Sequence, residues 1–128
     1  MTIARTTGAF VGVSESAGVG IAAGATYTGG ETDLLGGTDS TGMVNLYCRF
    51  TTAATRGDLL ITCRNNRVSG QAHTDSDKQF VVPAGQSGNN VFLGRFAVSR
   101  YMSVTVKNRL VGATADAVAV LYELEKTT

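Results

Sequence analysis

The sequence predicts an all-β protein, an antiparallel β-sandwich of jelly-roll-like character with about eight strands. Apolar and polar residues alternate in short segments, and alternation with a period of two is typical of strands that have one buried and one exposed face. Gly, Ser, Thr, Asp and Asn separate these segments, and no run has the spacing of an amphipathic helix. The clearest alternating segments are Val44–Phe50, Leu59–Arg64, Val91–Val98, Tyr101–Asn108 and Val118–Leu124.

A glycine-rich N-terminal part, residues 1–42, begins the chain and contains ten of its sixteen glycines. Apolar residues recur in Phe10–Val13, Ile21–Thr28 and Leu34–Leu35. Small residues within such strands allow another backbone to approach closely. We expect either integral strands here or an assembly arm that docks on a neighbouring subunit, and the strand-like spacing favours integral strands.

The rest of the chain is richer in Val, Leu, Ile and Phe and is expected to supply most of the core. With 128 residues, the chain is predicted to form a single β-sandwich domain, 1–128, that needs no disulfide or metal to hold it. Turn-forming residues predict loops at 36–42, 51–58, 65–78, 83–90 and 108–116.

The net charge of +1 gives no electrostatic support for a nucleic-acid or membrane partner. The charges are nevertheless segregated. Residues 1–44 contain one base and four acids, residues 45–112 nine bases and three acids, and residues 113–128 one base and three acids. These segments can pair within one subunit or between neighbours. The N-terminus lacks the pattern of a signal peptide and no segment has the length of a membrane span, so we expect synthesis in a reducing cytoplasm.

Both cysteines are predicted to point into the core. Cys48 shares its parity with Leu46 and Phe50, and Cys63 shares its parity with Ile61. If the two segments form a hairpin, the cysteines lie nearly opposite each other, where a strained disulfide is possible. Two buried thiols are the favoured alternative, because free cysteine packs as a small hydrophobic residue.

No motif predicts catalysis, a cofactor or a metal, and we expect a protein that is not an enzyme. Gly18, Gly20 and Ala23 fit a relaxed dinucleotide fingerprint, but a poor helix former follows where that motif needs a helix. The tripeptide Arg56–Gly57–Asp58 is interpreted as a turn rather than an integrin ligand. His73 is the only histidine, and with Asp75 and Asp77 it offers too few convergent ligands for a cation.

Four arginines and one tyrosine are the candidate interface residues. Arg49 and Arg64 are out of phase with their buried neighbours, so both are expected on outer faces, and on a shared face with Tyr47 if their strands pair. Such a face is either solvated or meets acidic residues of another subunit. Nucleic-acid binding ranks third, because stacking aromatics are not interleaved with these bases. The candidate residues are Arg49, Arg64, Arg95, Arg100 and Tyr47.

The C-terminal half, in the runs Val91–Phe96, Ser99–Asn108 and Val118–Leu124, resembles small β-sandwich structural proteins of tailed bacteriophages. These include capsid decoration (cement) proteins and tail accessory proteins. The resemblance implies a non-enzymatic virion protein that forms homo-oligomers, trimers above all, and contacts a major capsid or tail protein.

The alternative is a carbohydrate-binding module or a tail-associated receptor or adhesion protein. A glycan would stack on a tyrosine and bond to polar loop residues. The candidates are Tyr27, Tyr47, Tyr101, Asn65, Asn66 and Gln71.

Overall fold

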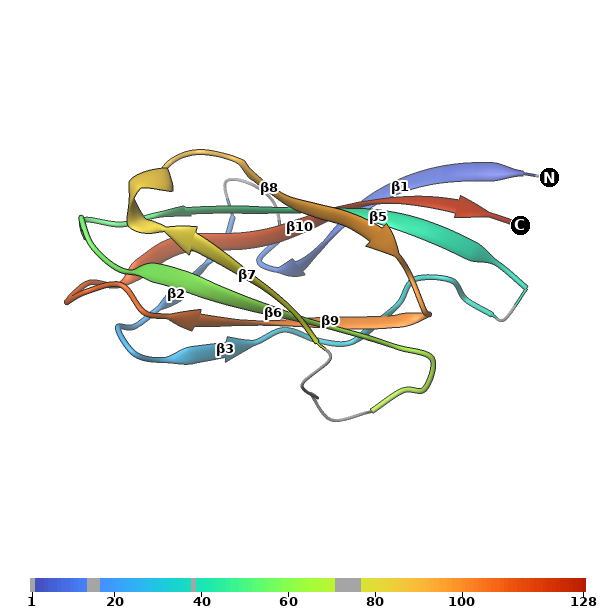
Figure 1. Ribbon diagram of the computed structural model, residues 1–128, viewed down its shortest axis with the longest axis horizontal. Coiled ribbons are helices and arrows are strands. Elements are labelled where there is room, and N and C mark those ends of the chain that lie inside the picture. Colours follow the sequence, from blue (N-terminus) through green and yellow to red (C-terminus); the bar gives the residue numbers. More distant parts are fainter. Residues whose placement is uncertain (1, 14–16, 38, 71–76) are drawn as a thin grey trace.

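The protein is an all-β sandwich of two antiparallel sheets, which confirms the predicted fold class (Figure 1). The computed structural model describes residues 2–13, 17–37, 39–70 and 77–128. No helix in these ranges is long and apolar enough to cross a membrane. The described elements are β1 (Ile3–Val11), β2 (Val19–Ile21), β3 (Thr26–Thr28), β4 (Thr32–Asp33), β5 (Thr41–Thr51), β6 (Asp58–Asn66), β7 (Lys78–Pro83), the 3-10 turn η1 (Ala84–Gln86), β8 (Val91–Ala97), β9 (Tyr101–Asn108) and β10 (Ala115–Thr127).

The ten described strands occupy eight positions in the two sheets. The first sheet has the order β1-β10-β5-β8, and β2 pairs with β10 beyond the end of β1. The second sheet has the order β3-β9-β6-β7, and β4 pairs with β9 further along that strand. Counting β1 with β2 and β3 with β4 as single positions gives the eight strands that the sequence predicts.

The strand pairings are nested, as in a jelly roll. The first position pairs with the last (β1 with β10), the second with the seventh (β3 and β4 with β9), the third with the sixth (β5 with β8) and the fourth with the fifth (β6 with β7). Folding this long antiparallel hairpin over itself produces the two four-position sheets, the jelly-roll arrangement.

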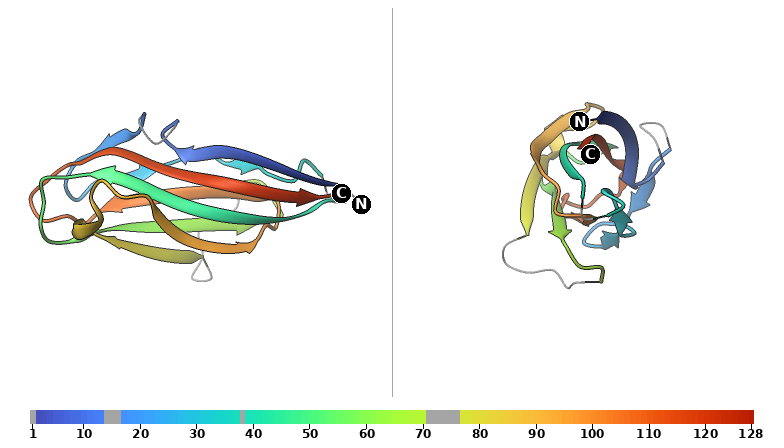
Figure 2. Two further views of the ribbon diagram at one scale, coloured as in Figure 1. Left: turned by 90° about the horizontal axis from the view of Figure 1, so that it is seen from above. Right: turned by 90° about the vertical axis from the view of Figure 1, so that its right-hand side faces the viewer.

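The strands of the N-terminal part are integral to the sandwich. Strands β1 and β2 pair with β10, and β3 and β4 pair with β9 of the same chain. The chain ends meet at one end of the molecule (Figure 2). There, the backbone N–H groups of Thr2 and Thr128 each donate to the other residue's carbonyl, at 3.1 and 3.0 Å.

The core lies between the sheets and is built by alternation, as predicted. In β5, Leu46, Cys48 and Phe50 are buried while Tyr47 and Arg49 between them are partly exposed, and Leu59 and Ile61 repeat the pattern in β6. Cys48 and Cys63 are free and buried, and burial raises the pKa of both thiols to about 12.

The conditional hairpin between the two cysteine segments is wrong. Strand β5 belongs to the first sheet and β6 to the second, so the two strands do not pair. The loop at 52–57 carries the chain from one sheet to the other. Local alternation specifies which residues are buried, but it is the same for a hairpin and for a crossing between sheets.

Candidate interaction surface

The outer face of the first sheet carries a row of apolar side chains that crosses all four strand positions. The register aligns Ala9 of β1 with Leu121 of β10, Leu121 with Tyr47 of β5, and Tyr47 with Phe92 of β8. We call these four residues the apolar row. Phe92 is 55% exposed, and its ring centroid lies 5.4 Å from that of Tyr47. An aromatic pair with one exposed ring, at the end of an apolar row, is a feature of binding surfaces more than of solvated sheets.

A β-bulge turns Phe92 outward. Leu46 pairs with Gly94 and Tyr47 pairs with Phe92, so Leu93 is an extra residue in β8. Phe96 is buried, and strict alternation would place Phe92 on the same inner face. The extra residue reverses the side on which Phe92 emerges. Sequence analysis therefore missed Phe92, because a bulge leaves no trace in a hydrophobic pattern this short.

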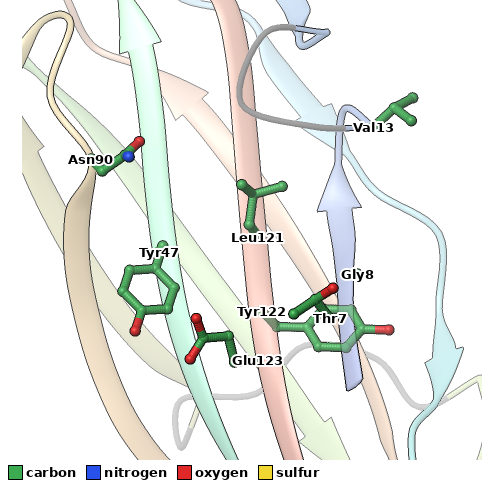
Figure 3. Close-up of a pocket in the computed structure, with 8 residues that line it drawn as sticks. All are labelled: Thr7, Gly8, Val13, Tyr47, Asn90, Leu121, Tyr122 and Glu123. Carbon is green, nitrogen blue, oxygen red and sulfur yellow. The ribbon is translucent and has the colours of Figure 1, made fainter. Parts of the chain in front are cut away.

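A groove of about 510 Å³ lies over the centre of the apolar row (Figure 3). Leu121 and Tyr47 line it, and Val13, which follows β1 and is 81% exposed, contributes from one side. Polar groups are contributed by Thr7, Glu123 and Asn90, the last just before β8. The groove therefore combines aliphatic and aromatic surface with a hydroxyl, a carboxylate and an amide.

Gly8 and Tyr122 shape the edge of this groove. The Tyr122 ring lies over Gly8 so closely that a Cβ at residue 8 would overlap the phenol. The same ring packs on Phe10, with 4.6 Å between centroids. A glycine at this position is what allows β1 and the tyrosine to share the space.

One cluster of charges on the outer face is paired within the chain. Arg5 Nε lies 3.5 Å from a Glu125 carboxylate oxygen, and Arg95 Nη2 lies 3.9 Å from the other. Arg95 Nη1 also donates to Asn45 Oδ1 at 3.3 Å. Arg49 and Glu123 differ, since neither makes an ion pair with another residue in the described part of the chain.

Arg64 lies on the second sheet, so the expectation that Arg49 and Arg64 share a face is wrong. The expectation failed because it required β5 and β6 to pair. Arg64 Nη2 donates to Glu31 Oε2 at 3.0 Å, and its side chain is only 15% exposed. The Ser69 hydroxyl and the Gly70 N–H also donate to Glu31, and these bonds, with Arg64, hold the pKa of this carboxyl below its usual value.

Arg100 is likewise occupied within its own chain. Its guanidinium Nε and Nη2 donate to both Asp33 oxygens, at 3.0 to 3.3 Å, and it lies 4.9 Å from the centroid of the Tyr101 ring. With the Gly36 N–H, Arg100 holds the pKa of Asp33 below its usual value. The acidic N-terminal segment thus pairs with the basic centre inside one subunit.

The remaining sequence motifs adopt ordinary structural roles. Gly57 has φ +92°, and a side chain there would meet the Arg109 carbonyl, so the Arg56–Gly57–Asp58 segment is a tight turn. Asp58 pairs with Arg109 at 2.6 Å. Gly18 and Gly20 precede or lie within strand β2 rather than starting a helix.

The residues that the sequence analysis weighed and rejected as cation ligands fall largely outside the described residues. His73, Asp75 and the glycan candidate Gln71 are in that position. Within the described ranges, no group of three His, Cys, Asp or Glu side chains is placed to hold a metal ion.

The glycan-stacking candidates do not gather in one place. Tyr47 lies on the first sheet, whereas Tyr27 (β3) and Tyr101 (β9) belong to the second. Asn65 is used internally, because its Nδ2 donates to the Ala97 carbonyl at 2.8 Å and its Oδ1 accepts from the Ser99 N–H at 2.7 Å. Of the glycan candidates within the described ranges, Tyr47 alone lines the groove over the apolar row.

Comparison with known proteins identifies no family for this chain. No family model and no curated protein matches it. Among solved structures, a ruminal GH26 endo-β-1,4-mannanase is similar at 17% identity and a TM-score of 0.44, over 77% of this chain and 18% of the mannanase.

Two structures of the VP2 protein of infectious bursal disease virus are also similar. A mutant VP2 in derived T=1 particles gives 10% identity and a TM-score of 0.37, over 97% of this chain and 39% of VP2. A VP2 subviral particle gives 10% identity and a TM-score of 0.31, over 98% and 40% of the two chains. This chain spans well under half of each of these proteins, and at such low similarity no property of theirs is carried over to it.

Proposed function

We propose that the protein is a non-enzymatic structural subunit of a virion, a capsid decoration or cement protein that stabilises its particle through subunit contacts, made by the outer face of the first sheet. The observation that supports this proposal is the apolar row with its groove, which lies open on a regular sheet face. Jelly rolls recur in viral capsid and lectin domains, and a rigid sandwich that presents one such face suits a role in assembly.

The energetics suit assembly in many copies. Full burial of a side chain such as Phe92 or Val13 against a partner contributes about 1.5–3 kcal/mol. A few such residues give only modest affinity for one contact, because the loss of translational and rotational freedom on association opposes binding. Contacts repeated around a particle add through multivalency, so modest individual interfaces suffice to stabilise it.

The test uses particles of the virus that encodes this chain, stripped of the protein and then redecorated. Wild-type protein is expected to bind and to raise the temperature at which the particles release their genome. Phe92→Glu is expected to weaken binding about tenfold or more. Val81→Glu is the matched control, because Val81 is 56% exposed but lies in β7 of the second sheet. Redecoration without any change in resistance to heat or low salt would exclude the cement role.

A carbohydrate-binding or receptor-binding role is the second candidate, and the groove in Figure 3 is the observation that favours it. Tyr47 supplies a ring for stacking, and Asn90, Thr7 and Glu123 supply hydrogen-bonding groups. A glycan array is the direct measurement. Binding that is lost in Tyr47→Ala and kept in Tyr27→Ala would support this candidate, and an empty array at high protein concentration would remove it.

A further inference from the structure

Two oppositely charged side chains that make no ion pair within the described part of the chain flank the apolar row. Arg49 lies two residues beyond Tyr47 along β5, and Glu123 lies two residues beyond Leu121 along β10, on the other side of the row. Neither makes an ion pair with a described residue of the chain. Arg49 is aligned with Ala119, four residues from Glu123, so the two positions are about 14 Å apart along the strands. They are therefore too far apart to pair within one subunit.

We propose that a second copy of this chain docks on the outer face of the first sheet about a two-fold axis. The apolar rows of the two copies pack on each other, and Arg49 of each copy pairs with Glu123 of the other. The proposal rests on the proposed function, because it names the partner that one such face accepts.

The arrangement of the face favours a copy of itself over an unrelated partner. A two-fold interface is self-complementary, so every contact occurs twice with the roles exchanged. A base and an acid that form no ion pair among the described residues, on opposite sides of an apolar centre, meet that condition. The cluster of Arg5, Arg95 and Glu125 already contains its own ion pairs, and Glu125 lies two residues further along β10 than Glu123, at the periphery of the contact.

The sheet geometry is compatible with this contact. A two-fold axis that exchanges the Arg49 and Glu123 positions lies in the plane of the interface, perpendicular to the line joining them. From ordinary strand spacing and rise, the strands of the two copies then cross at roughly 40°, close to the ~30° at which aligned sheets pack face to face.

The experiment measures mass in solution by light scattering over a range of protein concentrations, together with circular dichroism to verify folding. Wild-type protein is expected to form a dimer or another even-numbered oligomer. Arg49→Glu and Glu123→Arg alone are each expected to raise the dissociation constant about tenfold or more, because each places two like-charged pairs in the interface. Arg56→Glu, a charge reversal in an exposed turn, is the matched control and is expected to leave the mass unchanged.

Two samples that combine the substitutions test the pairing of Arg49 with Glu123 directly. The double variant Arg49→Glu with Glu123→Arg restores both ion pairs and is expected to recover the wild-type mass. An equimolar mixture of the two single variants is expected to form mixed dimers, since that combination also restores both pairs. Recovery in neither sample, a wild-type monomer, or an odd-numbered oligomer would overturn the proposal.

Failure of the two-fold contact can be distinguished from failure of the proposed virion role. A monomer that still binds and stabilises its particle would overturn the two-fold contact and leave the virion role intact. A dimer with the expected charge complementation that fails to bind particles would support the contact and contradict the virion role.

Discussion

At the scale of single residues, close contacts in this protein depend on side chains that are small or whose polar atoms are all hydrogen-bonded. Gly8 lies beneath Tyr122, and Asn108 is fully buried with three hydrogen bonds to backbone groups. Free cysteines fill two positions in the core. A substitution at each of these sites is expected to have a measurable effect, because a defined contact is lost or a defined overlap is created.

Gly8→Ala is expected to lower the free energy of unfolding by about 1–3 kcal/mol, because the added methyl displaces the Tyr122 ring from Phe10. Urea denaturation measures the change. Gly20→Ala is the matched control, since a Cβ there has no neighbour within 4 Å. Equal stability of the two variants would contradict the close packing at Gly8.

Neither Cys48 nor Cys63 is expected to react with iodoacetamide in the folded protein at pH 8. Burial raises the pKa of both thiols to about 12, so very little reactive thiolate is present and the core excludes the reagent. Mass spectrometry is expected to find no label on native protein and two labels after denaturation. A label on the native protein would show that the sandwich opens, and one label or none after denaturation would indicate oxidised cysteine.

Asn108→Ala is expected to lower the free energy of unfolding by about 2–4 kcal/mol, since two carbonyls and one N–H lose their partner in a buried site. The amide Nδ2 donates to the carbonyls of Ile21 and Ala113, and Oδ1 accepts from the Leu110 N–H, so one side chain joins β2 to the loop after β9. Thermal denaturation measures the change. The exposed Asn89→Ala is the control and is expected to change stability little.

At the scale of elements, acidic residues attach the connecting segments to the sheets. Glu31, just before β4, accepts hydrogen bonds from Ser69 and Gly70 after β6. Asp33 accepts from the Gly36 N–H and from Arg100, just before β9. These bonds lower the pKa of both carboxyls. Their contribution to stability is therefore present above the ordinary pKa and is lost as the pH falls through the lowered one.

Glu31→Gln is expected to lower the melting temperature at pH 7, because the charged carboxylate is the better acceptor for Arg64, Ser69 and Gly70. The difference from wild type is expected to shrink as the pH falls below the ordinary Glu value of 4.5, where wild type also becomes protonated. Melting curves recorded at a series of pH values measure this difference in melting temperature. Glu123→Gln is the control for the loss of one charge. A difference that stays constant down to strongly acidic pH would contradict the assigned role.

The strands were predictable from the sequence, whereas the partners of the candidate site residues were not. Alternation identified the buried positions of β5, β6, β9 and β10, because one face of each is fully covered. It also placed Tyr47 on an outer face. It could not indicate that Arg64 and Arg100 are neutralised by Glu31 and Asp33, since those contacts join segments 33 and 67 residues apart.

At the scale of the whole molecule, the nested pairing explains both the success and the failure of the topological predictions. The count of eight strands follows from local turn signals, which the sequence contains. The conditional hairpin between β5 and β6 does not form, because in this jelly roll the third and fourth positions lie in different sheets. Sequence order is therefore a poor guide to neighbours in this fold, and the outer face of the first sheet is assembled from distant segments.

Strand β10 lies between β1 and β5, although it is the last strand along the chain. During synthesis at roughly 5–20 residues per second, β1 and β5 emerge from the ribosome well before the strand that joins them. Until residues 115–127 are released, the first sheet cannot close and the apolar faces of its earlier strands stay exposed to other nascent chains. The position of β10 in the sheet therefore makes its release the step that allows the first sheet to close.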